Sequence, residues 1–157
     1  MRLRIATNPS FPAVADPEAD WFGFLADLAR ELGPAARWVE LSFIDDAQMR
    51  RLNRDWRGKD AATDVLSFSY GDESGGALPA AEDPEGEILI SVETAARQAA
   101  TAGHSLAEEV SVLVIHGLCH ILGMDHEAAS DAAAMAAAEA PYRRRIAAYF
   151  GSRNRRS

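Results

Sequence analysis

The spacing of apolar residues along the chain predicts a mixture of strands and helices of ordinary length. In residues 39–43 apolar side chains alternate with polar ones, which is the period of a strand with one buried face. Residues 21–32 instead carry an apolar side chain every three or four positions, as a helix with one buried face does, and Gly33-Pro34 ends that pattern. The other predicted strands are residues 3–7, 65–70 and 87–91.

Further helices are predicted from residues whose side chains can cap a helix N-terminus. Asp45 or Asp46 precedes one helix, and Ser91 precedes another that reaches about residue 102. Ser105 and Glu108 have the spacing of a capping box in front of an apolar helix. Each of these segments is long enough for several turns.

An alanine-rich segment, residues 130–150, predicts one more helix, since alanine has the highest helix propensity. Pro141 should kink or restart this helix because proline lacks a backbone donor. Residues 71–86 are rich in Gly, Pro and acids and predict a mobile loop, and residues 151–157 predict a basic tail. We therefore expect a single small α+β domain over residues 1–157, with about four strands and five or six helices.

Length and composition narrow the class of protein. The chain of 157 residues is long enough to bury a real core, and its single cysteine cannot form an internal disulfide. No apolar stretch approaches the roughly 20 residues of a membrane span, and the first residues lack the apolar core of a signal peptide. We expect a cytoplasmic protein that does not enter a membrane.

The charge is acidic overall but unevenly distributed. A formal net charge of −8 argues weakly against binding to nucleic acid, whose phosphates normally meet a basic surface. However, 11 of the 16 basic residues fall into two clusters: Arg50, Arg51, Arg54, Arg57 and Lys59, then Arg143, Arg144, Arg145, Arg153, Arg155 and Arg156. These clusters could bind RNA locally, or they could be a solvated helix face and a frayed tail.

Three histidines between residues 116 and 126 carry the strongest chemical signal. His116 and His120 stand four apart in an apolar run, so both imidazoles should project from one face of a helix. Gly123 can end that helix in a left-handed conformation, after which the chain can turn back and bring His126 to the same point. Three imidazoles with one open tetrahedral position are typical of a catalytic zinc.

The histidines also allow a simpler explanation, in which they lie in the core and bond to backbone carbonyls. Two histidines at this spacing, with a glycine and a third histidine after them, favour a metal, and zinc suits neutral imidazoles. Asp125 could orient a ligand or merely cap the turn. Cys119 points about 60° away from His116 around the helix and is expected to pack rather than to bind the ion.

The residue after the first histidine is Gly117. Zinc proteases with the H-E-x-x-H pattern have a glutamate there, which acts as the general base for the attacking water. Ordinary peptide hydrolysis therefore becomes less favoured, and the reaction would either use a base from elsewhere or depend on the metal alone to generate hydroxide.

Taken together, these residues resemble the YbeY family of metal-dependent endoribonucleases. Residues 116–126 are similar to the family signature H-G-x-L-H-L-x-G-x-D-H, with Cys119 and Ile121 as mild variations. Residues 57–68 are similar to a second block, R-G-K-D-x-P-T-D-V-L-S-F, with Ala62 in place of the proline. Residues 86–91 resemble a third block, with Glu87 where aspartate is commoner. The resemblance covers roughly residues 50–150.

The resemblance implies three metal ligands, at His116, His120 and His126, on a zincin-like helix, and a functional arginine at Arg57. It also implies cleavage of single-stranded RNA, maturation of the 3′ end of 16S ribosomal RNA in the small subunit, and a part in ribosome quality control, with small-subunit ribosomal proteins as further candidate partners. A metal and a planar guanidinium both suit the charge that develops on a phosphodiester during cleavage.

Several alternatives stay open at this stage. Arg57 could instead pair with Asp55 or Asp60, and Arg54 and Lys59 could contact phosphate or only solvent. The protein could be a zinc-dependent hydrolase of another class, or a non-catalytic assembly factor in which zinc only holds the fold.

Overall fold

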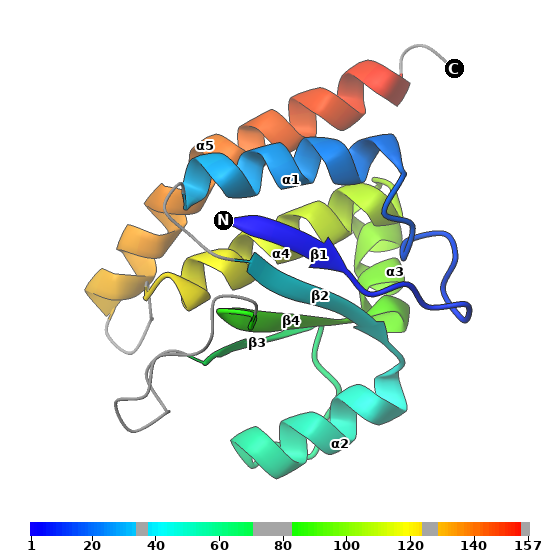
Figure 1. Cartoon of the computed structure of the whole chain (residues 1–157), viewed down its shortest axis with the longest axis vertical. Helices are drawn as coiled ribbons and strands as arrows, with labels where there is room; N and C mark the ends of the chain where they lie inside the picture. The colour runs from blue at the N-terminus through cyan, green and yellow to red at the C-terminus, as the bar shows by residue number, and fades with distance from the viewer. Residues whose placement is uncertain (34–37, 71–82, 124–128, 155–157) are drawn as a thin grey trace.

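The computed structural model describes residues 1–33, 38–70, 83–123 and 129–154. The described residues form four strands and five helices, which confirms the predicted α+β class (Figure 1). In chain order these are β1 (Arg2–Ile5), α1 (Asp20–Leu32), β2 (Trp38–Ile44), α2 (Asp46–Arg57), β3 (Val65–Ser69), β4 (Gly86–Ser91), α3 (Val92–Ala102), α4 (Leu106–Ile121) and α5 (Ala129–Asn154). The predicted ends of most elements differ from these by one or two residues.

The strands form one mixed sheet in the order β1-β2-β4-β3. Strands β1, β2 and β4 are parallel, and β3 runs antiparallel to β4 at the edge. Val39, Leu41 and Phe43 are buried while the residues between them are only half-buried, so the predicted alternation in β2 is confirmed. Because β3 is an edge strand, alternate residues turn their backbone polar groups away from β4.

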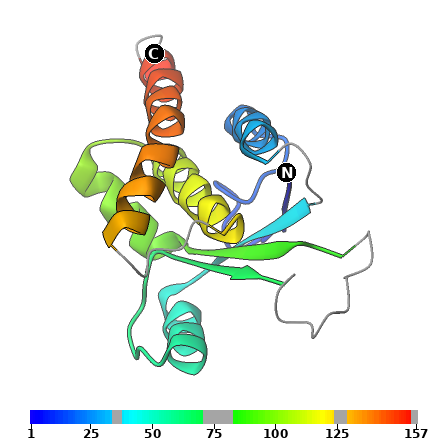
Figure 2. The same cartoon turned by 90° about the vertical axis from the view of Figure 1, so that its left-hand side faces the viewer.

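Helices cover the two faces of the sheet unequally (Figures 1 and 2). Helices α1 and α4 lie on one face, and α5 packs against the outer side of α4. The main hydrophobic core lies between these helices and the sheet, and it includes Leu25, Leu41, Ile88 and Val114. Helix α2 lies on the opposite face.

The second face has a small core of its own beneath α2. It is made of Ile44, Met49, Leu66 and Leu89, with Leu52 and Phe68 packed against it. Helix α4 and helix α2 therefore approach the β3–β4 edge from opposite faces of the sheet. The candidate functional residues lie on these two helices and on β3.

The helix caps agree with two of the three predictions. The Asp45 carboxylate accepts a hydrogen bond from the backbone of Gln48 at 2.8 Å, and the Ser105 hydroxyl accepts one from Glu108 at 3.1 Å. Ser91 does precede α3, but its side chain makes no capping bond. Its hydroxyl donates instead to Asp46, because the first turn of α2 places a charged acceptor beside it.

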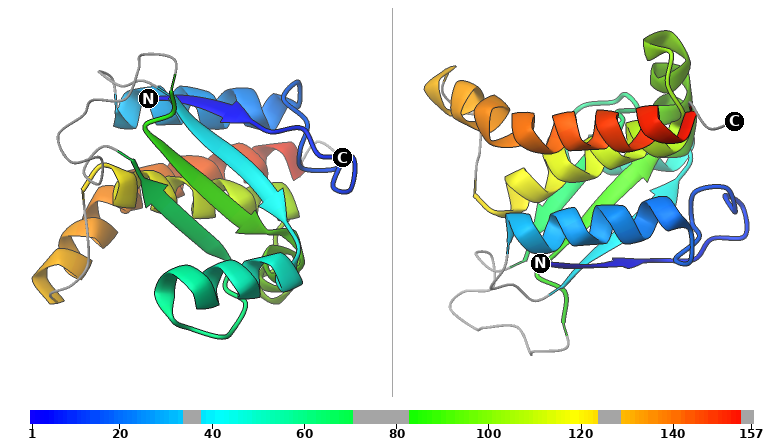
Figure 3. Two further views of the ribbon diagram at one scale, coloured as in Figure 1. Left: turned by 60° about the horizontal axis from the view of Figure 1, so that its bottom comes forward. Right: turned by 90° about the horizontal axis from the view of Figure 1, so that it is seen from above.

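Helix α5 is continuous through Pro141, so of the two outcomes predicted there, a kink or a restart, the restart does not occur. Its axis changes direction along the way, as the missing backbone donor allows (Figure 3). The helix reaches Asn154, inside the segment predicted as a basic tail. Most of the predicted loop 71–86 lies outside the described residues, and its last residue, Gly86, begins β4. Among the described helices, none combines the length and the apolar character needed to cross a bilayer.

Candidate functional site

His116 and His120 project from one face of α4, as their spacing predicts. Their Nε2 atoms lie 3.1 Å apart, and the ring planes are inclined at 79°. Two imidazoles bound to one tetrahedral zinc at about 2.0–2.1 Å place their nitrogen atoms roughly 3.3 Å apart. The two side chains therefore fit the separation that a shared zinc ion requires.

Glu139, from helix α5, contacts the Nδ1 atom of His116. Its Oε1 lies 3.0 Å from His116 Nδ1, and the residue is only 4% exposed. A carboxylate at this position favours the tautomer with hydrogen on Nδ1, which leaves the Nε2 lone pair directed toward His120. The Arg143 guanidinium lies 3.8 Å from the same oxygen atom.

Glu139 was not among the site residues predicted from the sequence, although a signal for it exists. Met135, Ile146 and Phe150 are buried at helical spacing on α5, and Glu139 shares their face. An acidic residue on the buried side of an amphipathic helix needs a partner, and such residues are candidates for an ion-binding or catalytic site.

The third predicted ligand, His126, and the neighbouring Asp125 lie outside the described residues. Within the described ranges, no group of three or more His, Cys, Asp or Glu side chains could hold a metal ion. Cys119 is fully buried in the main core, and burial, with Glu139 nearby, raises the pKa of its thiol to about 11. It packs in the core, as predicted.

The position after the first histidine faces the sheet rather than the site. A Cβ atom on Gly117 would lie 3.0 Å from Ile88 Cδ1 and 3.2 Å from Ile88 Cγ1. A glutamate at this position would have to enter the packed core between α4 and β4. The structure thus gives a packing reason for the glycine.

The helix that ends at Ile121 turns at Gly123 as expected. The φ of Gly123 is 90°, in the left-handed region, and its N–H donates to the His120 carbonyl at 3.0 Å. This conformation favours glycine over residues with a Cβ. The turn directly follows His120.

Arg57 lies in the last turn of α2 and reaches the edge strand. Its Nη2 donates to the carbonyl of Ser67 at 3.3 Å. The loop that follows α2 is bonded back to that helix, because Asn53 Nδ2 donates to the Ala61 carbonyl at 2.8 Å. The contact of Arg57 with Ser67 links the end of α2 to β3.

Arg57 and His120 line the same small hollow, whose volume is about 190 Å³. Ser67, Ser69 and Ile121 complete the described part of its wall. We call this space the histidine hollow. Two residues that are 63 positions apart in the sequence, one from each face of the sheet, are thus brought together at the β3 edge.

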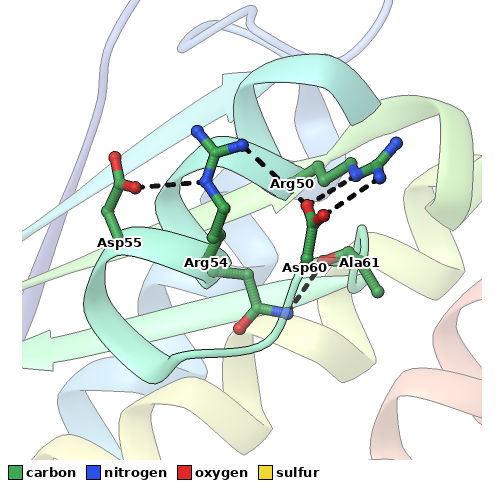
Figure 4. A network of polar contacts seen from close by, with 6 residues as sticks. Arg50, Arg54, Asp55, Asp60 and Ala61 are labelled. Atoms are coloured by element: carbon green, nitrogen blue, oxygen red, sulfur yellow. Dashed lines mark hydrogen bonds and ion pairs between the residues drawn. The ribbon is translucent and has the colours of Figure 1, made fainter.

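The acids that Arg57 could have paired with are bound by other arginines (Figure 4). Arg50 contacts both carboxylate oxygens of Asp60, at 2.8 and 3.2 Å. Arg54 lies between Asp55, at 3.4 Å, and Asp60, at 4.0 Å. Arg57 therefore keeps its charge available at the hollow.

The other basic residues that the structure describes do not line this space. Arg54 and Lys59 are exposed, and neither is among the described residues that line the histidine hollow. In the second basic cluster, Arg145 pairs with Glu31, and Arg143 lies near Glu139. The side chains of the remaining arginines near the C-terminus, Arg153, Arg155 and Arg156, are outside the described part of the chain.

Comparison with known proteins agrees with the motifs. Residues 20–147 match the family model described as endoribonuclease YbeY. The chain is 51% identical over 104 residues to the endoribonuclease YbeY of Moorella thermoacetica, a match covering 63% of this chain and 66% of that protein. It is 50% identical over 101 residues to the endoribonuclease YbeY of Myxococcus xanthus, covering 64% of this chain and 34% of that one.

The matched region thus spans less than two thirds of the length of these relatives. The fold is also similar to a solution structure of a protein from Thermotoga maritima, with a TM-score of 0.61 at 22% identity, covering 97% of this chain and 92% of that one. That likeness supports the fold alone. The family model covers most of the chain and the two motifs occur in order, so this chain belongs to the endoribonuclease YbeY family.

Proposed function

We propose that the chain is a metal-dependent endoribonuclease that cleaves single-stranded RNA. The observation that carries the proposal is the histidine hollow, where Arg57 lies with His120, one of two imidazoles whose Nε2 atoms are 3.1 Å apart. Membership of a family whose relatives are named endoribonucleases supports the same activity.

The donor set suits zinc, held by His116, His120 and His126. When bound, zinc would supply Lewis-acid polarisation of the phosphodiester and of the attacking water. Glu139 would hold His116 in the tautomer and orientation needed for binding, through the 3.0 Å contact with Nδ1. His126 enters this set from the sequence motif.

Arg57 would bind the scissile phosphate and stabilise its developing charge. The guanidinium carries a permanent charge in a planar fork that can contact two phosphate oxygens. Its present partner is a neutral carbonyl on the edge strand, so phosphate would not have to displace a carboxylate. Arg54 and Lys59 would contact phosphates farther along the strand, and the ion pairs of Arg54 are exposed and therefore weak.

The biological substrate we propose is ribosomal RNA of the small subunit, cut during 3′-end maturation of the 16S species and during ribosome quality control. Small-subunit proteins are candidate partners at that stage, and the cytoplasm is the expected location. These assignments rest on the family resemblance.

Two rival functions make different use of the same residues. A zinc-dependent protease would need a general base beside the histidines, and Gly117 faces the core instead. A non-catalytic assembly factor would need zinc only for stability. The placement of Arg57 beside His120 favours an enzyme that acts on phosphate.

One experiment separates the three functions. Zinc-loaded protein and the His120→Ala variant, purified identically, are incubated with labelled single-stranded RNA, duplex RNA and casein. We expect metal-dependent cutting of the single strand only, absent from the variant. Casein cleavage would support the protease, and no cleavage by folded, zinc-containing protein would support the assembly factor. Zinc retained by a His116→Ala/His120→Ala protein would count against the metal site.

A further inference from the structure

A larger hollow adjoins the histidine hollow on the α2 side of the sheet. Its volume is about 770 Å³, and Arg57, Ser67 and Ser69 line both spaces. The two hollows therefore meet along the outer edge of β3. We call the larger space the aromatic groove, because three aromatic side chains line it: Trp56, Phe68 and Tyr70.

Two of the three aromatic side chains of this groove are open to solvent. Trp56 is 69% exposed and Tyr70 is 37% exposed, and among the described residues these are the two large hydrophobic side chains that are exposed. Trp56 and Phe68 are in edge contact, with ring centroids 6.0 Å apart and planes inclined at 68°. An exposed indole held against a second ring forms a rigid apolar surface suited to a flat ligand.

The charges of the groove indicate which part of a nucleotide it would take. Arg57 lies where the groove meets the histidine hollow and suits a phosphate. Glu87 also lines the groove and accepts a hydrogen bond from the Tyr70 hydroxyl at 2.6 Å. A carboxylate repels phosphate, so the sugar–phosphate chain is favoured at Arg57 and the base at the aromatic rings.

We propose that the aromatic groove binds an unpaired nucleobase, stacked on Trp56, while Arg57 holds the adjoining phosphate beside the histidines. The inference rests on the proposed function, and it adds a physical basis for choosing single strands. A base in a duplex is already paired and stacked, and it would have to lose both contacts before it could enter the groove. An unpaired base needs no such step, and stacking on an aromatic ring accepts every base.

The test measures binding separately from cleavage. A short RNA single strand, 2′-O-methylated to resist cutting, carries one 2-aminopurine, whose fluorescence falls when it stacks. Its affinity and fluorescence are compared for the zinc-loaded wild type, Trp56→Ala and Trp56→Phe. Gln48→Ala, at an exposed and uncharged position of α2, is the matched control. Thermal unfolding checks that each variant is folded. We expect the Trp56 variants to fold, because the Trp56 side chain is exposed.

We expect the affinity of Trp56→Ala to fall about 5- to 100-fold, the range of one lost stacking contact, with loss of the fluorescence change. Trp56→Phe should keep most of both. A strand that lacks the base at the 2-aminopurine position should bind the wild type about as weakly as the complete strand binds Trp56→Ala. Equal affinities of wild type and Trp56→Ala, in folded samples, would overturn the proposal.

Two other results would also overturn it. If Trp56→Ala changes the mass of the particle in sedimentation, the aromatic surface joins two copies of the chain. If the wild type binds duplex RNA as tightly as the single strand, the groove does not select unpaired bases. Cleavage is measured separately. Base stacking without any cleavage would support the base-binding groove and contradict the proposed nuclease activity. Cleavage that does not depend on Trp56 would support the nuclease activity and contradict the base-binding groove.

Discussion

His116 Nδ1 and Glu139 Oε1 lie 3.0 Å apart, and this contact joins helix α4 to helix α5 behind the candidate metal site. The two residues are 23 positions apart, and the carboxylate is buried. A buried carboxylate on the outer nitrogen of a histidine both orients the ring and raises its basicity as a ligand.

Glu139→Gln should weaken zinc binding while keeping the fold. The amide oxygen can still accept from Nδ1, but the negative charge is lost, and changes of this kind cost about 10- to 100-fold in metal affinity. Competition with a chelator of known affinity measures the change. Glu18→Gln, an exposed acid in the loop before α1, is the control. A zinc affinity equal to that of the control would show that Glu139 only fills space in the core.

Arg57→Lys should retain binding of single-stranded RNA but lose roughly 100-fold in turnover, since a point charge replaces the two-pronged contact with the phosphate. Single-turnover cleavage of a labelled strand gives the rate, and anisotropy gives the affinity. Arg51→Lys makes the same chemical change elsewhere on α2 and should leave both unchanged. Equal turnover of the two variants would exclude a catalytic part for Arg57.

Gly117→Ala should destabilise the protein by about 1 kcal/mol, because the new methyl group would press on the fully buried Ile88. The gain in helix propensity, up to about 1 kcal/mol, offsets only part of that strain. In an Ile88→Val background, which lacks the nearest carbon atom, the same change should cost less or even stabilise. Urea unfolding of the wild type, the two single variants and the double variant gives the coupling free energy between positions 117 and 88. An identical cost in both backgrounds would contradict this account of the glycine.

Asp46 should make folding sensitive to acid. Hydrogen bonds from Ser91 and Thr94, and then from Arg97, lower the pKa of its carboxyl from 3.8 to about 2. A carboxyl with a lower pKa in the folded state stabilises the fold fully above pH 3.8, and this stabilisation is lost as the pH falls toward 2. The side chain is 27% exposed, so we expect a contribution of about 1–2 kcal/mol at neutral pH.

Urea unfolding of wild type and Asp46→Asn at pH 7, 4 and 2.5 measures this contribution. The difference in unfolding free energy should be largest at pH 7 and should shrink at pH 2.5. Asp55→Asn, which removes only an exposed contact with Arg54, should differ little from wild type at any pH. A difference for Asp46→Asn that does not depend on pH would point to lost packing instead of lost charge.

Local pattern was sufficient to predict most of the secondary structure. The alternation in residues 39–43, the caps at Asp45 and Ser105 and the left-handed Gly123 depend on neighbours within a few positions, which the sequence displays directly. The common face of His116 and His120 follows from helix geometry in the same way. The cap at Ser91 was predicted wrongly because Asp46, from another helix, competes for its hydroxyl.

Long-range contacts could be read only from the tertiary structure. The mixed sheet places α2 and α4 on opposite faces of the same edge, and this alone brings Arg57 to His120. Glu139 meets His116 because α5 packs on α4, and Gly117 is required because α4 crosses close to Ile88. Residue types and local spacing along the chain therefore indicated the histidines and Arg57 but not Glu139. Their arrangement depended on how distant segments pack, which no local pattern encodes.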